Sequence, residues 1–147
     1  KICGFNPQEM ANTVWAFATA GVTAQALFEA IAGAAVNQIG KFNVQNMANM
    51  AWAFACAGWE QSDPFMVLGS AILGRFSELN DIGKSQLYLV TVYVQIEWPR
   101  LEFPLLAHLK SFRLAYKGSG VTPSRFQREV STMLEQLGWR HTFEYET

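Results

Sequence analysis

Phe5-Asn6-Pro7-Gln8-Glu9-Met10-Ala11-Asn12-Thr13-Val14-Trp15-Ala16-Phe17-Ala18-Thr19-Ala20-Gly21 is the stretch that decides the fold, because a second copy occupies residues 42–58. The two copies start 37 residues apart and agree at 12 of 17 positions. A fixed period of this size is typical of stacked repeats, in which one unit cannot bury its apolar face alone. The sequence therefore predicts a 37-residue structural repeat.

Each copy has the start and stop signals of a helix. Asn6 precedes Pro7 and stands three residues before Glu9, which predicts an N-cap, a first helical residue and a capping box. Asn43 takes the same place in the second copy, and the glycine that closes each copy is a natural C-terminal stop. The apolar residues fall on one face at helical spacing, so the first helix of a unit is amphipathic.

A second helix is expected in each unit. Thr23 can cap one whose apolar residues recur at helical spacing until Gly40, and Asp63-Pro64 starts the corresponding helix of the next unit. Each unit is therefore predicted to be an antiparallel helix pair. Trp15 and Trp52 hold the same edge position in the two units, where an aromatic ring can bridge successive pairs.

The period continues in degraded form from Leu79. Residues 87–94 are rich in β-branched and aromatic side chains and would also suit a buried strand, but the repeat register favours a helix. Trp98-Pro99 is the expected turn, and a partner helix is predicted from about Leu105 to Tyr116.

The repeat pattern ends in a stretch of glycine, serine and proline. After it, residues from Ser124 predict one helix closed by Gly138, and residues 140–147 alternate as a strand. The predicted organisation is the tail of a preceding repeat at 1–4, repeats at 5–41, 42–78 and 79–117, a linker at 118–123, and the start of a truncated α/β module at 124–147.

Composition narrows the classes of function. The net charge of −1 argues against a general polyanion binder, although residues 105–128 carry five cationic and no acidic side chains. Cys3 and Cys56 form no CxxC motif, so no zinc or redox site is indicated. No apolar run approaches the about 18 residues of a membrane helix, so we expect no membrane partner.

Two separate stretches resemble one family. The FNxQxMANxxWAFAxAG pattern at 37-residue spacing resembles the helical-hairpin repeats of organellar RNA-binding proteins, the heptatricopeptide and octotricopeptide repeat group with FAST-kinase-like relatives. Residues 124–130, Leu137-Gly138 and 143–145 resemble the segment that leads into the RAP domain of such proteins. The resemblance implies an all-α, right-handed solenoid of about three helical hairpins, followed by a fragment of a small α/β module, acting on RNA in mitochondria or, alternatively, plastids.

Equivalent positions of the first helices carry amide side chains. Helical-repeat proteins address bases with side chains from such positions, and an amide both donates and accepts hydrogen bonds. The base-facing candidates are Gln8, Asn12, Gln45, Asn49 and Gln86. The alternative is that these amides only meet solvent or bond to the neighbouring helix pair.

A basic series provides candidates for phosphate contact. Three of its members recur at spacings of three and four, which is one face of a helix, and two follow the linker. The candidates are Lys110, Arg113, Lys117, Arg125 and Arg128. An ordinary solvated helix face is the alternative. Tyr88 and Tyr93 could stack on bases, but the sequence favours buried packing for both.

No set of residues points to catalysis. His108 and His141 are isolated, no nucleophile with a partner histidine can be drawn, and no glycine-rich phosphate loop follows a strand. Glu129, Glu144 and Glu146 lack the metal-binding partners that a nuclease needs. We therefore expect no enzyme activity, no catalytic residue, no metal, no cofactor and no small-molecule substrate.

The sequence, with the resemblance, leads to one expectation and one alternative. We expect a non-catalytic RNA-binding or RNA-scaffolding subunit of an organellar ribonucleoprotein, with a mitochondrial ribosome or RNA-processing assembly foremost. Its partners would be organellar rRNA or a transcript and the other proteins of that assembly. The alternative is a protein-interaction scaffold without direct RNA contact.

Overall fold

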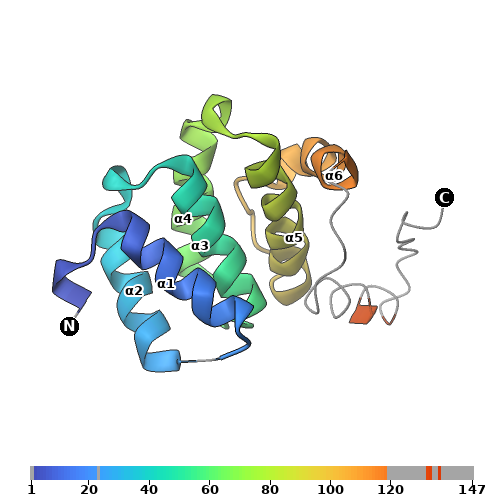
Figure 1. Cartoon of the computed structure of the whole chain (residues 1–147). Helices are drawn as coiled ribbons and strands as arrows, with labels where there is room; N and C mark the ends of the chain where they lie inside the picture. The colour runs from blue at the N-terminus through green and yellow to red at the C-terminus, as the bar shows by residue number, and fades with distance from the viewer. Residues whose placement is uncertain (1, 23, 119–131, 134–135, 137–147) are drawn as a thin grey trace.

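The computed structural model describes residues 2–22, 24–118, 132–133 and 136 (Figure 1). Most of these residues are helical and none lies in a strand, which confirms the predicted helical character for this part of the chain. The α-helices are α1 (Pro7–Thr19), α2 (Gln25–Asn37), α3 (Val44–Cys56), α4 (Asp63–Gly74), α5 (Asp81–Glu97) and α6 (Leu109–Gly118). The short 3-10 turns are η1 (Ile2–Gly4), η2 (Ile39–Lys41), η3 (Phe76–Glu78) and η4 (Leu106–His108).

Three predictions fall wholly or mostly outside the described residues. They are the cap at Thr23, the linker at 118–123 and the α/β module with its strand at 140–147. Of the linker only Gly118 is described, and it is the last residue of α6 and not part of a loop. Of residues 124–147, only 132–133 and 136 are described, and these three are helical.

The 37-residue period is present in the backbone. Helix α3 begins and ends 37 residues after α1, and η1, η2 and η3 recur at the same interval. The side-chain oxygens of Asn6 and Asn43 accept hydrogen bonds from backbone N–H groups three residues on, at 2.8 and 2.7 Å. Glu9 completes the capping box through the backbone N–H of Asn6. Asn80 caps α5 in the same way at 2.8 Å, so the capping series extends into the third unit.

The helix ends follow from glycine. Gly21 and Gly58 have φ angles of 70° and 67°, a left-handed conformation in which a side chain would be strained. Gln95 occupies the corresponding position of the third unit, and a glutamine would be strained in this left-handed conformation. Helix α5 therefore continues to Glu97 and has 17 residues, against 13 in α1 and α3.

The helices form two layers. Helices α1, α3 and α5 lie side by side in one layer, and α2 and α4 lie side by side behind them (Figure 1). Helix α3 is central because it packs against α1, α5 and α4. Its buried residues are Val44, Met47, Ala48, Met50, Ala51, Ala53, Phe54 and Ala55.

An aromatic cluster joins the first two helix pairs. The ring of Trp59 lies 6.1 Å from that of Phe28 and 5.6 Å from that of Phe54, measured between ring centroids. Phe54 in turn meets Phe65 of α4 at 6.4 Å. Since Phe28 belongs to α2 and Trp59 follows α3, the cluster fixes one unit on the next.

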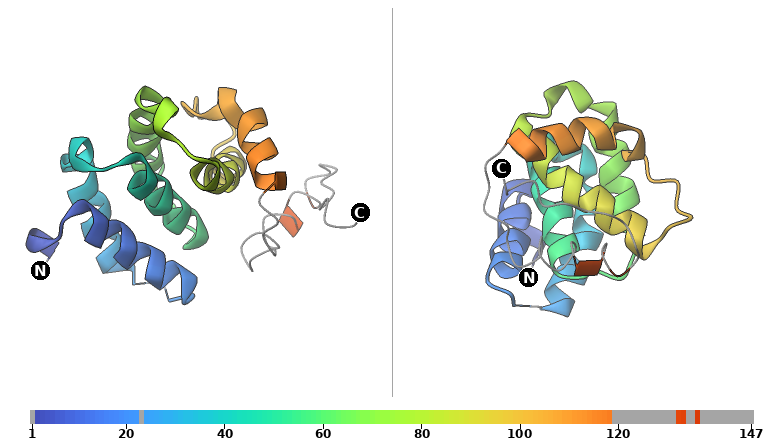
Figure 2. Two further views of the ribbon diagram at one scale, coloured as in Figure 1. Left: turned by 45° about the horizontal axis from the view of Figure 1, so that its top comes forward. Right: turned by 90° about the vertical axis from the view of Figure 1, so that its right-hand side faces the viewer.

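The third unit is built differently after α5. The connection from Trp98 to Leu105 is not helical and covers α4, where a Cβ atom added to Gly69 would lie 2.7 Å from the ring of Phe103. The predicted partner helix begins at Leu109 rather than at about Leu105, and it packs against α5. Helix α5 thus lies between α3 and α6, and it packs against both (Figure 1 and the left view of Figure 2).

Candidate nucleic-acid interface

Three of the five amide candidates hold one another across two helices. Gln45 Nε2 donates to Asn49 Oδ1 at 2.8 Å and to Gln86 Oε1 at 3.1 Å. Gln86 Nε2 donates to Asn49 Oδ1 at 2.9 Å. We call Gln45, Asn49 and Gln86 the amide cluster; its members are partly buried and link α3 to α5. The interpretation that amides bond to the neighbouring helix pair therefore applies to these three.

The two amides of α1 are in a different state. Gln8 and Asn12 are exposed, and the structure shows no hydrogen bond from either side chain to another described residue. Asn12, Asn49 and Gln86 occupy equivalent positions in the three units, each 37 residues after the one before. The side-chain oxygen of Asn49 accepts one hydrogen bond from Gln86 of α5 and one from Gln45 of its own helix, so it offers no partner to Asn12 across the α1–α3 contact.

The tryptophans that share this edge pack as the sequence predicts. Trp15 and Trp52 lie 6.4 Å apart between ring centroids, at an interplanar angle of 33°, which confirms a bridge between successive units. Trp15 is nevertheless 42% exposed, whereas Trp52 is partly buried. Leu89 takes the corresponding place on α5 and is buried, so the third unit has no aromatic ring there.

Helix α6 presents a basic outer face, which we define by Lys110, Arg113 and Lys117. All three are exposed, and α6 contains no acidic residue. The opposite side is held against the core by Phe112 and Tyr116. Arg125 and Arg128, the other phosphate candidates, lie outside the described residues.

Contacts between aromatic rings hold α6 in place. The ring of His108 lies 4.1 Å from that of Phe76 in η3, and the ring of Tyr116 lies 5.0 Å from that of Tyr88 in α5. These contacts explain why α6 packs against α5 and not against α4. They also keep the basic face turned outward.

The two tyrosines of α5 pack in the hydrophobic core. Tyr88 and Tyr93 are both buried, which confirms the favoured interpretation. The hydroxyl of Tyr93 donates to the backbone oxygen of Trp59 at 2.9 Å. Burial, with the nearby charges of Glu97 and Glu60, raises the pKa of Tyr93, so it stays a neutral donor.

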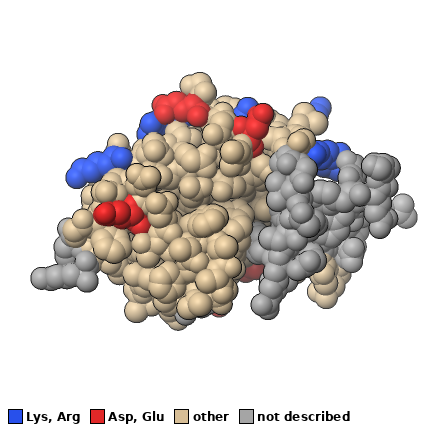
Figure 3. All heavy atoms as spheres, viewed as in Figure 1, with Lys and Arg blue, Asp and Glu red and all other residues tan. Residues whose placement is uncertain are grey.

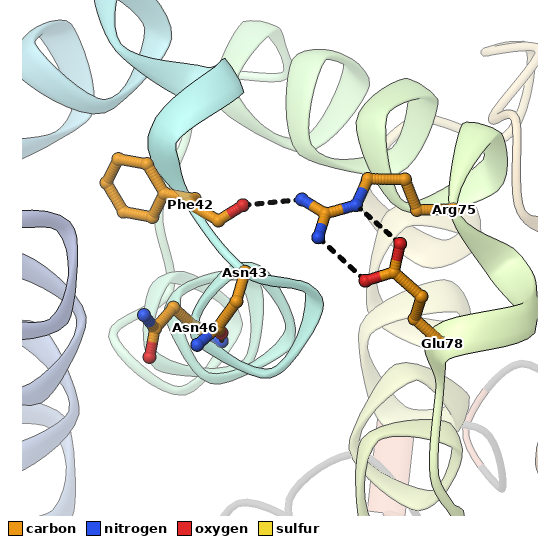
Figure 4. Close-up of polar contacts among 5 residues, drawn as sticks. All are labelled: Phe42, Asn43, Asn46, Arg75 and Glu78. Carbon is orange, nitrogen blue, oxygen red and sulfur yellow. Dashed lines mark hydrogen bonds and ion pairs between the residues drawn. The ribbon is translucent and has the colours of Figure 1, made fainter.

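An arginine that the repeat pattern did not reveal fixes the start of α3. Arg75 Nη1 donates to the backbone oxygen of Phe42 at 2.7 Å, and its other nitrogens bind both carboxylate oxygens of Glu78 at 2.9 and 2.7 Å (Figure 4). This pairing lowers the pKa of Glu78 and raises that of Arg75. In the sequence, only the spacing of three residues between Arg75 and Glu78 indicated that the two side chains form an ion pair. Phe42 is 33 residues away.

The surface over α1 and α3 is almost uncharged. Glu9 is the one charged residue of α1, and α3 has none. Figure 3 shows this neutral face, with charged side chains along its upper and left edges. The structure therefore separates a neutral, amide-bearing surface on α1 and α3 from the basic outer face of α6.

Among the described residues, no three His, Cys, Asp or Glu side chains are grouped to hold a metal ion. No helix in this part of the chain has the length and apolarity needed to cross a membrane. In comparisons with known proteins, no family model, no curated protein and no solved structure matches this chain significantly.

Proposed function

We propose that this chain is a non-catalytic RNA-binding or RNA-scaffolding subunit of an organellar ribonucleoprotein, in a mitochondrial ribosome or RNA-processing assembly. The compartment, with plastids as the alternative, rests on the resemblance of the repeat pattern to organellar repeat proteins. The same resemblance supports a right-handed solenoid followed by a RAP-type module. Contact with RNA rests on the side chains described above.

The observation that carries the proposal is the basic outer face of α6. Lys110, Arg113 and Lys117 lie on one side of a helix that has no acidic residue. Side chains three and four positions apart on a helix are neighbours, at about 5–6 Å between Cβ atoms. Cations at this spacing can contact successive phosphates of one RNA strand, which supplies affinity without base specificity.

Removing two of these cations tests the proposal. We expect the double variant Lys110→Ala with Arg113→Ala to bind single-stranded RNA more weakly at low salt. Because each lost phosphate contact lowers the salt dependence of single-strand binding by about 0.7, the slope of log K against log salt should flatten by about 1.4. Fluorescence anisotropy with a labelled RNA at several salt concentrations measures both quantities.

A matched control removes the same charges elsewhere. Lys41 and Arg100 are exposed and lie outside α6, so Lys41→Ala with Arg100→Ala changes net charge equally. This control should keep the wild-type salt slope. Equal slopes for both double variants would contradict phosphate contact by α6.

A protein-interaction scaffold is the second candidate function. The observation that favours it is that Val36 of α2 and Leu73 of α4 occupy corresponding positions and are 38% and 40% exposed. Paired exposed apolar side chains on one layer suit a protein neighbour. Crosslinking in the native assembly separates the candidates, since a scaffold would give protein crosslinks from α2 and α4 and no RNA crosslink from α6.

A further inference from the structure

The amide cluster of Gln45, Asn49 and Gln86 lies in the middle of the layer formed by α1, α3 and α5. Helix α3 packs against α1 on one side and against α5 on the other (Figure 1). The three amide side chains are partly buried with both neighbouring helices in place. The part of them that still reaches solvent therefore belongs to a packed region of the array and not to its end.

The hydrogen bonds within the cluster fix the direction of the Asn49 amide. Its Oδ1 atom accepts from Gln45 Nε2 at 2.8 Å and from Gln86 Nε2 at 2.9 Å, which uses both lone pairs. Its Nδ2 atom donates to no other described residue, yet it is not enclosed. Within the described residues, the buried side-chain nitrogen without a partner is Nε1 of Trp59. Asn49 therefore offers two N–H donors to a ligand and no acceptor.

The first turn of α5 explains why the amides point this way. A triangle of three amides would close equally well with every nitrogen and oxygen exchanged. Gln45 Oε1, however, lies beside Gly83, where an added Cβ atom would be 3.6 Å from it. Gly83 is in the first turn of α5, whose positive dipole end favours an oxygen over an amide nitrogen. This turns the nitrogen of Gln45 toward Asn49 and the nitrogen of Asn49 outward.

A donor without an acceptor favours a ligand that presents a carbonyl oxygen. Uracil and guanine carry a carbonyl oxygen at the edge position where cytosine and adenine carry an amino group. An amino group would face the N–H donors of Asn49 and leave them unpaired. Helix α3 has no charged residue, so it supplies no cation for a phosphate, and a neutral base carbonyl suits this surface better.

We infer that Asn49 recognises the O4 atom of an unpaired uracil or the O6 atom of an unpaired guanine, with Gln45 and Gln86 as positioning residues. This inference rests on the proposed function, in which α6 contacts the phosphates. The two ends of one amide then have separate roles. The oxygen of Asn49 links α3 to α5, and its nitrogen meets the base.

Oligouridine and oligocytidine of equal length provide the first test. They offer the same phosphates and differ at the carbonyl or amino group that faces Asn49. We expect the wild-type protein to bind oligouridine about 2- to 10-fold more tightly, which corresponds to one hydrogen bond made or lost. Fluorescence anisotropy at a single salt concentration measures both affinities. No substitution is needed, so this test does not depend on the folding of a variant.

Asn49→Asp provides the second test. It keeps an oxygen for the hydrogen bonds from Gln45 and Gln86 and replaces the outward N–H donors by an acceptor. The preference for oligouridine should disappear or reverse in this variant. Asn46→Asp is the matched control, because it adds the same charge one turn earlier on α3 and outside the amide cluster. It should weaken binding of both oligonucleotides equally and keep the wild-type ratio.

The outcomes separate this inference from the proposed function. Equal wild-type affinities for the two oligonucleotides would overturn recognition by Asn49, and so would a wild-type preference that persists in Asn49→Asp. A wild-type preference for oligocytidine would mean that Asn49 presents its oxygen, which also overturns the inference. In these three cases the proposed function stands if the salt slope depends on α6. If the wild-type protein binds no RNA, both fail.

Discussion

Arg75 joins the two ends of the second repeat, and the first repeat has nothing equivalent. Its guanidinium reaches back to the backbone oxygen of Phe42, the first residue of that unit, while Glu78 holds it in a bidentate pair. The corresponding residues of the first unit are Gln38 and Lys41, which cannot form an ion pair. These two differences in sequence give the second unit a contact between its two ends, just before the helix that carries Gln45 and Asn49.

Glu78 should make a small part of the stability depend on pH. Its pKa is lowered in the folded state, so its contribution is present above the unfolded pKa of about 4.3 and is lost as the pH falls toward the folded value. We expect Glu78→Gln to be less stable than wild type near neutral pH, with a difference that shrinks below about pH 4.3. Urea unfolding across this range measures the difference.

The arginine partner provides the control for this effect. In an Arg75→Gln background, the further change Glu78→Gln should have no comparable pH dependence, because the pair is already broken. Parallel stability curves for wild type and Glu78→Gln over the acidic range would contradict the pairing. The effect should also decrease with added salt, since both side chains are exposed.

At the level of helices, the same residue types have different tasks in α1 and α3. Asn12 and Asn49 are equivalent in the repeat, yet Asn49 accepts two hydrogen bonds and Asn12 is exposed without one from the described residues. The difference arises from the neighbouring helix, because α5 brings Gln86 to Asn49. A repeat position therefore does not define a function until its neighbour is known.

The two asparagines should respond differently to alanine. Asn49→Ala removes the acceptor of both Gln45 and Gln86, and we expect a loss of about 1–2 kcal/mol of unfolding free energy. Asn12→Ala should change stability by less than about 0.5 kcal/mol. It should instead alter preference among homopolymeric RNAs, which competition binding measures. A larger stability loss for Asn12→Ala than for Asn49→Ala would contradict the observed hydrogen bonding.

At the scale of the whole molecule, the connection after α5 gives the array its asymmetry. Trp98 packs on Phe65 at 5.6 Å between ring centroids, and Phe103 lies directly over Gly69, so α4 is covered by chain that is not helical. Helix α6 is then free to pack on α5 and to expose its basic face. The absence of a side chain at residue 69 is what permits this close approach.

Gly69→Ala should therefore be destabilising. Its Cβ would lie 2.7 Å from the Phe103 ring, which must move, and we expect a cost of about 1–3 kcal/mol. Gly33→Ala is the matched control, because its Cβ meets nothing within 4 Å in α2 and alanine is the better helix former. It should stabilise by about 0.5–1 kcal/mol. Thermal unfolding of both variants measures these changes in stability. Equal effects of the two substitutions would contradict the close packing of Phe103 on Gly69.

Much of the helical framework could be predicted from the sequence because its causes are local. The caps at Asn6 and Asn43 depend on backbone groups three residues away, and the stops at Gly21 and Gly58 depend on the conformational freedom of one residue. The repeat register also chose correctly between helix and strand for residues 87–94, where local propensity was ambiguous. For the candidate site, the sequence predicted which residues belong to it but not how their side chains are arranged.

By itself, the sequence determined the helical units, their period, their caps and the residue types on their polar edge, since these follow from hydrogen bonds and periodicity within a few residues. Tertiary structure alone decided which amides are free, that Trp15 remains exposed, that Arg75 reaches Phe42 and that α6 lies on α5. The physical reason is distance along the chain. The Gln45–Gln86 and Arg75–Phe42 contacts join residues 41 and 33 positions apart, and only packing of the helices brings such groups within hydrogen-bonding range.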